Sequence, residues 1–433
     1  MPIPSPLQML KRIPGRSWFL VMCGMGMLIA YADRSNMAVA VVAIAKEFNY
    51  TKEQQGWVLS AFFMGYIITP ILGGALADRH GGKHVLITGA IVWTACTLLA
   101  PLAAQIGLGW LVVTRVVLGL GEGVAYPSLH SMIGKWSPPN ERSTAVATIT
   151  AFGYMGPVLA LPISSALVGS AWGWRSVFWF FGVLGVVWIT CWQFWGASTP
   201  AQCSWISERE TDWIQARLES DVIDHNVEHV DASTGFERGG GREEDYTQSV
   251  DTDSGAVSYH RLPLEEHSAS PRSSEATDPH PTQDMDQTIQ LRGCREKRTP
   301  WKQLLKRREV WAIIVSQFCN SFGFFIFQSW IPTFYLDNYG VDVSKIGYYA
   351  VLPSIMQGVM GLTAGFIGDK AIRDWKFSAL SVRRFGQVVG SIGLGIFLLL
   401  AVFFANSASA AMILITIGMT LNGFTMIGAS AYQ

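Results

Sequence analysis

The chain has 433 residues, of which 50% are hydrophobic and 15% are charged. Ordinary soluble domains carry roughly 25% charged residues, so this composition excludes a typical water-soluble protein. The 32 basic and 32 acidic residues cancel, whereas a nucleic-acid-binding protein normally shows a basic patch and a high pI. We therefore expect a lipid bilayer as the surroundings and no nucleic-acid partner.

Cysteine usage indicates neither a disulfide framework nor a zinc site, because no Cys-x-x-Cys pair occurs. We expect no metal and no cofactor. The first sixteen residues contain Lys11, Arg12 and Arg16 but no short apolar core with a cleavage site, which argues against a removable signal peptide. The six cysteines are Cys23, Cys96, Cys191, Cys203, Cys294 and Cys319.

Apolar stretches of the length needed to cross a membrane, about 20 residues, recur along the chain. They predict ten transmembrane helices and an all-α polytopic membrane protein. The expected spans are Trp18–Ala43, Gly56–Ala77, His84–Ala104, Leu108–Ile133, Ser143–Leu167, Ser176–Trp195, Val310–Tyr335, Ile346–Ile367, Phe385–Ala405 and Ala410–Ala429.

These spans divide the chain into a tail (1–17), a six-helix half (18–196), a loop between the halves (197–309) and a second half with four helices (310–433). From 221 to 298 the loop is polar and predicted to be disordered, since it buries too little apolar surface to offset its ordering entropy. Its histidines also permit a metal-binding tract, but we favour a solvated linker. They are His225, His229, His260, His267 and His280.

The distribution of Lys and Arg among the short loops predicts the orientation, since cytoplasmic loops hold the excess. We expect a multi-pass protein with a cytoplasmic N-terminus and a cytoplasmic loop between the halves. The richer set of loops includes Arg16, Arg79, Lys83, Lys135, Arg142, Lys306, Lys370 and Arg383, and the poorer set has Lys46, Lys52, Arg175 and Lys345.

The run GALADRHGGK, from Gly74 to Lys83, separates the second and third helices, and GFIGDK, from Gly365 to Lys370, occupies the corresponding place in the second half. Both resemble the signature cytoplasmic loop of the major facilitator superfamily, whose two six-helix halves are related by a pseudo-two-fold axis. The resemblance implies the major facilitator fold, with ten of its twelve helices present here. A gating role is favoured over a simple positive anchor for Gly74, Asp78, Arg79, Gly81 and Lys83.

Further stretches resemble the anion:cation symporter family, which includes plant plastid-type phosphate transporters, sialin, vesicular glutamate transporters and bacterial sugar-acid symporters. The resemblance implies transport of a small anion coupled to a cation. These stretches are Tyr31–Ile44, Thr114–Ser128, Lys135–Ser143, Gly173–Gly182, Thr199–Glu210 and Phe318–Tyr335.

Four Asp, Glu or Arg residues fall inside predicted spans: Asp33, Arg34, Arg115 and Glu122. Such residues are costly in a membrane and indicate function. Arg115 and Glu122 are seven positions apart, which places them on one helix face. Guanidinium groups suit carboxylate or phosphate, so we expect the arginines to bind the anion and the carboxylates to couple H⁺ or Na⁺. The alternative is that the four residues only form ion pairs that fix helix packing.

We expect all four charged side chains in one cavity between the first and fourth helices. Tyr31, Tyr66, Asn320 and Gln328 are further candidates for anion binding. The resemblance implies an arginine at Asn320 and a histidine at Leu59 in glutamate carriers, so both residues argue against that branch. The sequence leaves phosphate and organic carboxylate open. Gly119, Gly121 and Gly123 are expected to serve close helix packing.

The expected function is therefore a secondary transporter, acting as a monomer by alternating access, and not an enzyme, because no nucleophile, metal or cofactor motif is visible. A receptor that binds the anion without moving it is the alternative. The chain stops at Gln433, at the end of the tenth predicted helix. We expect a longer natural protein with two further helices.

Overall fold

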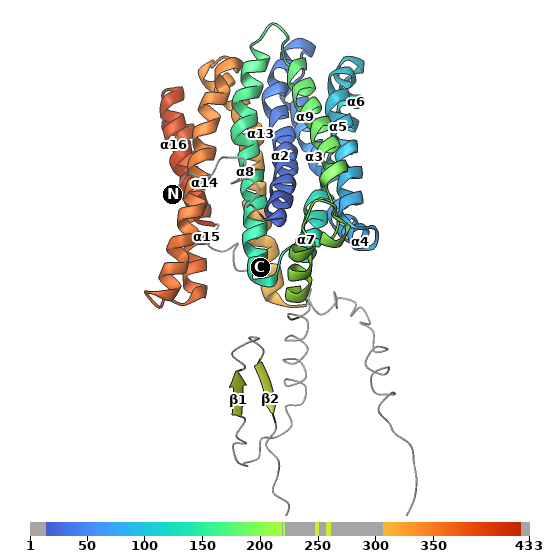
Figure 1. The fold of residues 1–433 in the computed structure, drawn as a ribbon. Helices are drawn as coiled ribbons and strands as arrows, with labels where there is room; N and C mark the ends of the chain where they lie inside the picture. Colours follow the sequence, from blue (N-terminus) through green and yellow to red (C-terminus); the bar gives the residue numbers. More distant parts are fainter. Residues whose placement is uncertain (1–13, 219, 221–246, 251–256, 261–305, 426–433) are drawn as a thin grey trace, which may run out of the picture. The chain divides into compact units, whose positions relative to one another are not determined.

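The computed structural model describes residues 14–218, 220, 247–250, 257–260 and 306–425. It divides into two compact units, one formed by Met1–Asp224 with Gln317–Gln433 and the other by His225–Ser316. The first unit is a bundle of long helices, in which α3, α5 and α6 gather at one side and α14, α15 and α16 at the other (Figure 1).

Ten helical segments in the described part of the chain are long and apolar enough to cross a membrane, which confirms the expected number. The first half contains α2 (Gly15–Phe48), α3 (Lys52–Tyr66), α4 (Thr69–His80), α5 (Gly82–Ile106), α6 (Leu108–Glu122), α7 (Ala125–Trp136), α8 (Pro139–Val168) and α9 (Arg175–Trp195). The second half contains α13 (Arg308–Tyr339), α14 (Val343–Arg373), α15 (Ala379–Phe404) and α16 (Ala408–Asn422). Short 3₁₀ helices lie at Pro200–Gln202 (η1) and Gly423–Thr425 (η2).

Two of the spans are broken helices. The second is split into α3 and α4, with Pro70 in the first turn of α4, where the missing N–H of proline costs no helical hydrogen bond. The fourth is split into α6 and α7 directly after Glu122. The break therefore places a carboxylate at the C-terminal end of α6, in the interior of the bundle.

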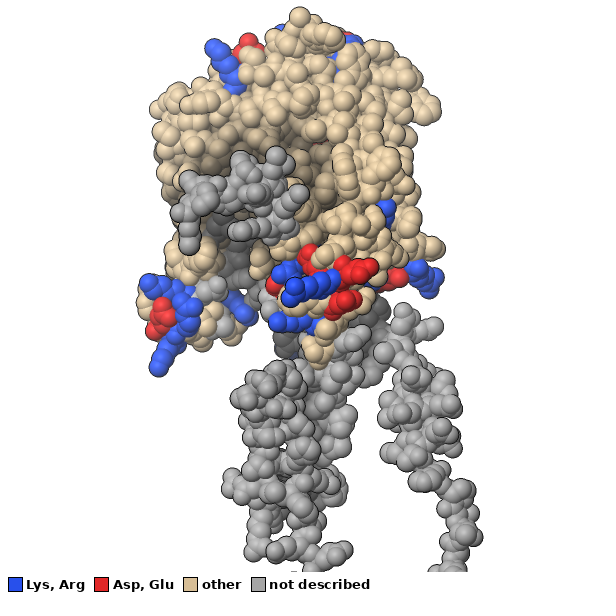
Figure 2. All heavy atoms as spheres, in the orientation of Figure 1, with Lys and Arg blue, Asp and Glu red and all other residues tan. Residues whose placement is uncertain are grey.

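The outer surface of the bundle is apolar, as a membrane requires. Large side chains such as Ile67, Ile71 and Phe403 are 74–78% exposed. On the face drawn in Figure 2, charged side chains lie mainly at the two ends, with a belt almost free of Lys, Arg, Asp and Glu between them. We call the end at which α2 begins the basic end; it also holds Arg79, Lys83 and Lys135, near the ends of α4, α5 and α7.

Glycine allows α3 and α6 to approach closely. A Cβ atom on Gly119 would lie 2.1 Å from the backbone oxygen of Phe62, and one on Gly65 would lie 2.0 Å from the backbone oxygen of Val116. Because small residues let membrane helices pack backbone to backbone, this crossing holds α6, and with it Arg115, against α3. The expected packing role of Gly119 is confirmed.

The two halves meet at the end opposite the basic end. Lys52, at the start of α3, forms an ion pair with Asp337 near the end of α13, with 2.5 Å between Nζ and Oδ2. Ser165 of α8 accepts a hydrogen bond from the backbone N–H of Gly347 in α14 at 2.9 Å. These contacts join α3 to α13 and α8 to α14, and so close this end of the bundle.

In the second unit, β1 (Thr247–Val250) pairs antiparallel with β2 (Val257–His260), and Val250 lies opposite Val257. Most of the segment from 221 to 298, including four of its five histidines, lies outside the described residues. Disorder of this segment stays a prediction.

The α3–α6 crossing gives a prediction about stability. Gly119→Ala should lower the melting temperature by several degrees, because overpacking costs roughly 1–3 kcal/mol. Gly109→Ala in the same helix is the matched control, since nothing lies within 4 Å of its Cβ position. Differential scanning fluorimetry of the purified protein in detergent measures both. Equal melting temperatures for the two variants would contradict the close approach.

Candidate functional site

A buried ion pair joins α2 to α6. Arg34 Nη2 lies 3.1 Å from Glu122 Oε2, and the side chains are 8% and 0% exposed. Taking both charges out of water is costly, and removing one partner of such a pair typically destabilises a protein by about 3–5 kcal/mol. The pair therefore occupies the interior only because each charge neutralises the other.

Arg115 lies two helical turns before Glu122, on the same face of α6, and is only 2% exposed. Among the described residues, no carboxylate lies within ion-pair distance of it, and its Nε has no hydrogen-bond partner. A buried charge without a partner is strongly unfavourable. Glu122 and Asp33 act on Arg115 only at longer range, without a direct ion pair.

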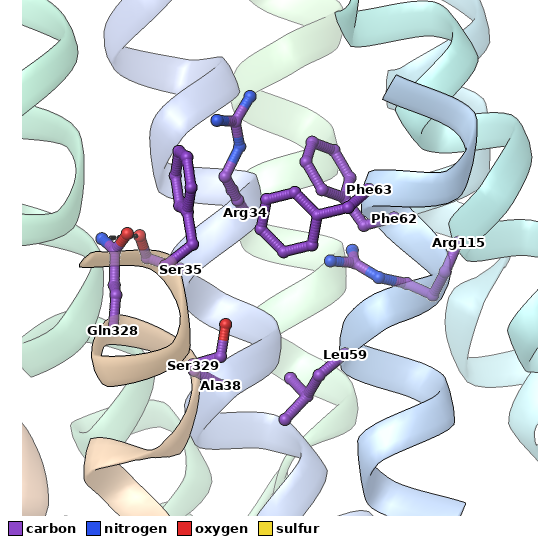
Figure 3. Close-up of a pocket in the computed structure, with 10 residues that line it drawn as sticks. Arg34, Ser35, Ala38, Leu59, Phe62, Phe63, Arg115, Gln328 and Ser329 are labelled. Atoms are coloured by element: carbon purple, nitrogen blue, oxygen red, sulfur yellow. Dashed lines mark hydrogen bonds between the residues drawn. The ribbon is translucent and has the colours of Figure 1, made fainter. Parts of the chain in front are cut away.

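Arg34 and Arg115 line one small cavity, with Phe62 and Phe63 drawn between them in Figure 3. The volume of the cavity is about 10 Å³, roughly the space of one water molecule. This space is too small for phosphate or a carboxylic acid. Its lining consists of Arg34, Ser35, Ala38, Leu59, Phe62, Phe63, Arg115, Phe325, Gln328 and Ser329.

The two expected tyrosines both lie beside Arg34. The guanidinium carbon is 4.7 Å from the ring centre of Tyr31 and 4.7 Å from that of Tyr66. Tyr31 also exchanges a hydrogen bond with Tyr126 of α7, with 3.2 Å between the hydroxyl oxygens. These tyrosines present ring faces to the cation, and neither is among the residues that line the cavity.

The expectation of one cavity for all four charged residues is wrong, because only Arg34 and Arg115 line it and Asp33 and Glu122 do not. Asp33 lies apart from it. It is 1% exposed, accepts hydrogen bonds from Thr97 of α5 at 3.1 Å and from Asn36 at 3.2 Å, and does not line the cavity. Neighbouring helical residues project about 100° apart, so Arg34 faces the cavity while Asp33 faces α5.

The second half contributes Gln328, whose Nε2 donates to Ser35 Oγ at 3.0 Å across the two halves (Figure 3). Asn320 is placed differently. Its Oδ1 accepts from Asn422 of α16 at 3.3 Å, and Asn422 in turn accepts from Gln357 of α14 at 2.9 Å. Gln328 lines the cavity, whereas Asn320 belongs to an amide network that joins α13, α14 and α16.

The expected gating residues lie at the basic end. Asp78 accepts a hydrogen bond from Ser131 of α7 at 2.8 Å. The backbone N–H of Lys83 donates to Ser198 at 3.1 Å, and its Nζ donates to the carbonyl oxygen of Gln193 at 3.0 Å. Gly81 has φ +86°, a left-handed conformation that favours glycine.

The two remaining gating residues, Gly74 and Arg79, lie in more open surroundings. A Cβ on Gly74 would touch only Pro127, at 3.7 Å. Arg79 is exposed at the end of α4. These contacts of the gating residues are to the first half and to Ser198, which directly follows it.

Several residues at the site were missed from sequence. Ser35 and Thr97 are small hydroxyl residues of a kind common in membrane helices, and Asn422 and Gln357 are single amides in apolar runs. An amide at mid-membrane depth could have marked the last two, because an unpaired amide is costly there. Phe62 could not be recognised as a site residue from the sequence, since phenylalanine is ordinary in an apolar helix.

The sequence model of a protein family described as the Major Facilitator Superfamily matches residues 23–432 of the chain. A probable anion transporter 4, chloroplastic, of Oryza sativa subsp. japonica is 31% identical over 390 residues, which cover 90% of this chain and 54% of the relative. The chloroplastic ascorbate transporter of Arabidopsis thaliana is 30% identical over 90% of this chain and 58% of the relative. Human sialin is 29% identical over 89% and 63%.

The chain thus spans between 54% and 63% of the length of these relatives. Among solved structures, a bacterial homolog of the human lysosomal transporter Spinster, inward-facing and unoccupied, matches with a TM-score of 0.61 and 17% identity over 97% of this chain and 75% of that chain. A D-xylose-proton symporter matches with a TM-score of 0.57 and 13% identity, over 95% and 80%. At these sequence identities, the likeness shows only that the fold is shared.

The match over residues 23–432 shows that the chain belongs to the Major Facilitator Superfamily, and the broken helices and interior arginines agree with it.

Proposed function

We propose that the protein is a secondary active transporter that moves a small anion across a membrane, coupled to H⁺ or Na⁺, by alternating access. The observation that carries this proposal is Arg115, a guanidinium that lines the cavity and has no carboxylate partner within ion-pair distance among the described residues. An incoming anion would neutralise it. Its planar fork of donors suits carboxylate or phosphate.

The names of the relatives support an anionic substrate. They include a probable anion transporter, an ascorbate transporter and a sodium-dependent phosphate transport protein. Inorganic phosphate and organic carboxylate both fit a guanidinium site. No histidine or acidic side chain is among the residues lining the cavity, so the lining is cationic and otherwise neutral.

Coupling follows from the competition between Glu122 and the anion for Arg34. While Glu122 is ionised, it holds Arg34 at 3.1 Å. When Glu122 binds a proton, the ion pair is lost and Arg34 can bind the anion. Because linkage is reciprocal, anion binding then favours protonation of Glu122. Asp33 is the second coupling candidate, and its carboxylate with the Thr97 hydroxyl also offers oxygens to Na⁺.

Alternating access would begin from the state seen here, in which the cavity is too small for the anion. Opening the end opposite the basic end requires breaking Lys52–Asp337 and Gly347–Ser165, and opening the cavity requires separating Gln328 from Ser35. At the basic end, which we assign to the cytoplasm on its Lys and Arg content, Gly74, Asp78, Arg79, Gly81 and Lys83 would form the gate. We propose a monomer as the transporting unit.

Arg115 gives a prediction about the binding site. Arg115→Gln should reduce anion uptake by at least tenfold, because the charge is lost, and Arg115→Lys should recover little of it, because the fork geometry is lost. Uptake of inorganic phosphate and of ascorbate into proteoliposomes measures this. Arg209→Gln, at an exposed position beyond the bundle, controls for protein level and should transport normally.

Near-normal uptake by Arg115→Gln would contradict the assignment of this residue. Counterflow of labelled anion separates transport from simple binding. A protein that binds phosphate or ascorbate without any exchange would instead be a receptor descended from a transporter.

Glu122 gives a prediction about coupling. Glu122→Gln should lose uphill accumulation, so that the internal to external anion ratio falls to about 1, yet keep exchange of anion for anion, because the titrating group alone is removed. Asp33→Asn tests the second candidate in the same assay. Equal loss of exchange and accumulation in both variants would show that the carboxylates are structural.

The identity of the coupling ion needs one further measurement. Replacing sodium by choline at fixed pH stops accumulation if Na⁺ is the driving ion. If H⁺ is the driving ion, accumulation persists and is abolished by a protonophore.

A further inference from the structure

Aromatic rings enclose the guanidinium of Arg34. Its Cζ lies 4.6 Å from the ring centre of Phe62, 4.7 Å from those of Tyr31 and Tyr66, and 5.5 Å from that of Phe325. A cation over a ring face within about 6 Å is attracted by the ring quadrupole. Four rings therefore lie close enough to attract this cation, while its Nη2 donates to Glu122.

One of these rings also serves the second arginine. The Cζ of Arg115 lies 5.5 Å from the ring centre of Phe62, so Phe62 lies close to both guanidinium groups. Two like charges in a low-dielectric interior repel strongly, and Glu122 pairs with Arg34 alone. The π face attracts each cation without offering an oxygen acceptor, so it does not compete with the anion.

The backbone fixes the position of this ring. Phe62 is fully buried, and its carbonyl oxygen lies against Gly119 of α6, four residues from Arg115. The close α3–α6 crossing therefore sets the distance between the ring and the arginine on α6. Packing against Tyr66, with ring centres 5.5 Å apart, orients the ring further.

We propose that Phe62 is a positioning residue for anion binding, whose ring holds the guanidinium groups of Arg34 and Arg115 in place beside the cavity. This inference rests on the proposed function, in which the two arginines bind the anion. Affinity then depends on the π charge of the side chain at position 62, and not only on its volume.

Graded fluorination at position 62 tests this. One, two or three fluorine atoms on the phenylalanine ring, introduced by nonsense suppression, withdraw π charge while nearly preserving the shape. The KM for uptake of phosphate or ascorbate should rise stepwise, by on the order of tenfold for the trifluorinated ring, with the maximal rate changing less than about twofold. Phe62→Leu should raise the KM at least as much, and Phe62→Tyr should retain a KM near that of the natural protein.

Phe181 of α9 provides the matched control. It is equally buried but packs among apolar residues and makes no cation–π contact in the described part of the chain. Fluorination there should leave the KM unchanged. A flat KM across the fluorinated series at position 62, or equal effects at 62 and 181, would overturn the inference.

The outcomes also separate this inference from the proposed function. If Arg115→Gln abolishes uptake while fluorination at position 62 leaves the KM unchanged, the anion site is supported and the role of Phe62 is contradicted. If the unsubstituted protein takes up neither phosphate nor ascorbate, or Arg115→Gln takes them up normally, the site assignment fails, and the role of Phe62 fails with it.

Discussion

The interior of this bundle holds two guanidinium groups that have to be accommodated without water. One charge, on Arg34, is neutralised by Glu122 at 3.1 Å. The other, on Arg115, lines a cavity with no carboxylate at ion-pair distance in the described residues. Glu122 and Asp33 act on Arg115 only at longer range, so one buried guanidinium is directly paired and the other is not. Both the proposed substrate class and the proposed coupling follow from that imbalance.

The helices supply the geometry that this imbalance needs. The break after Glu122 places the carboxylate at the end of α6, and the glycine crossing brings α6 against α3. As a result, Arg115 on α6 and Arg34 on α2 lie near the same face of α3, where Phe62 is buried. A larger residue at Gly119 would separate these elements, so packing and binding depend on the same contact.

The small volume of the cavity makes anion binding depend on conformation. A space of about 10 Å³ admits no substrate anion, and the contacts Lys52–Asp337 and Gly347–Ser165 join the halves at one end. Gln328 reaches Ser35 at the level of the cavity. Movement of one half against the other would therefore change access and the environment of the arginines together, as the proposed alternating access requires.

The sequence by itself determined the ten apolar spans, the charged positions within them and the shared face of Arg115 and Glu122, because hydropathy and helical spacing are local properties. Only the tertiary structure decided which neighbour each side chain meets. Asp33 turned out to face Thr97 of α5, and Asn320 joined an amide network with Asn422. The position of Phe62 beside α6 depends on the close approach of α3 to α6. Spacing along one helix gives the direction of a side chain, but the helix it faces depends on packing between segments distant in sequence.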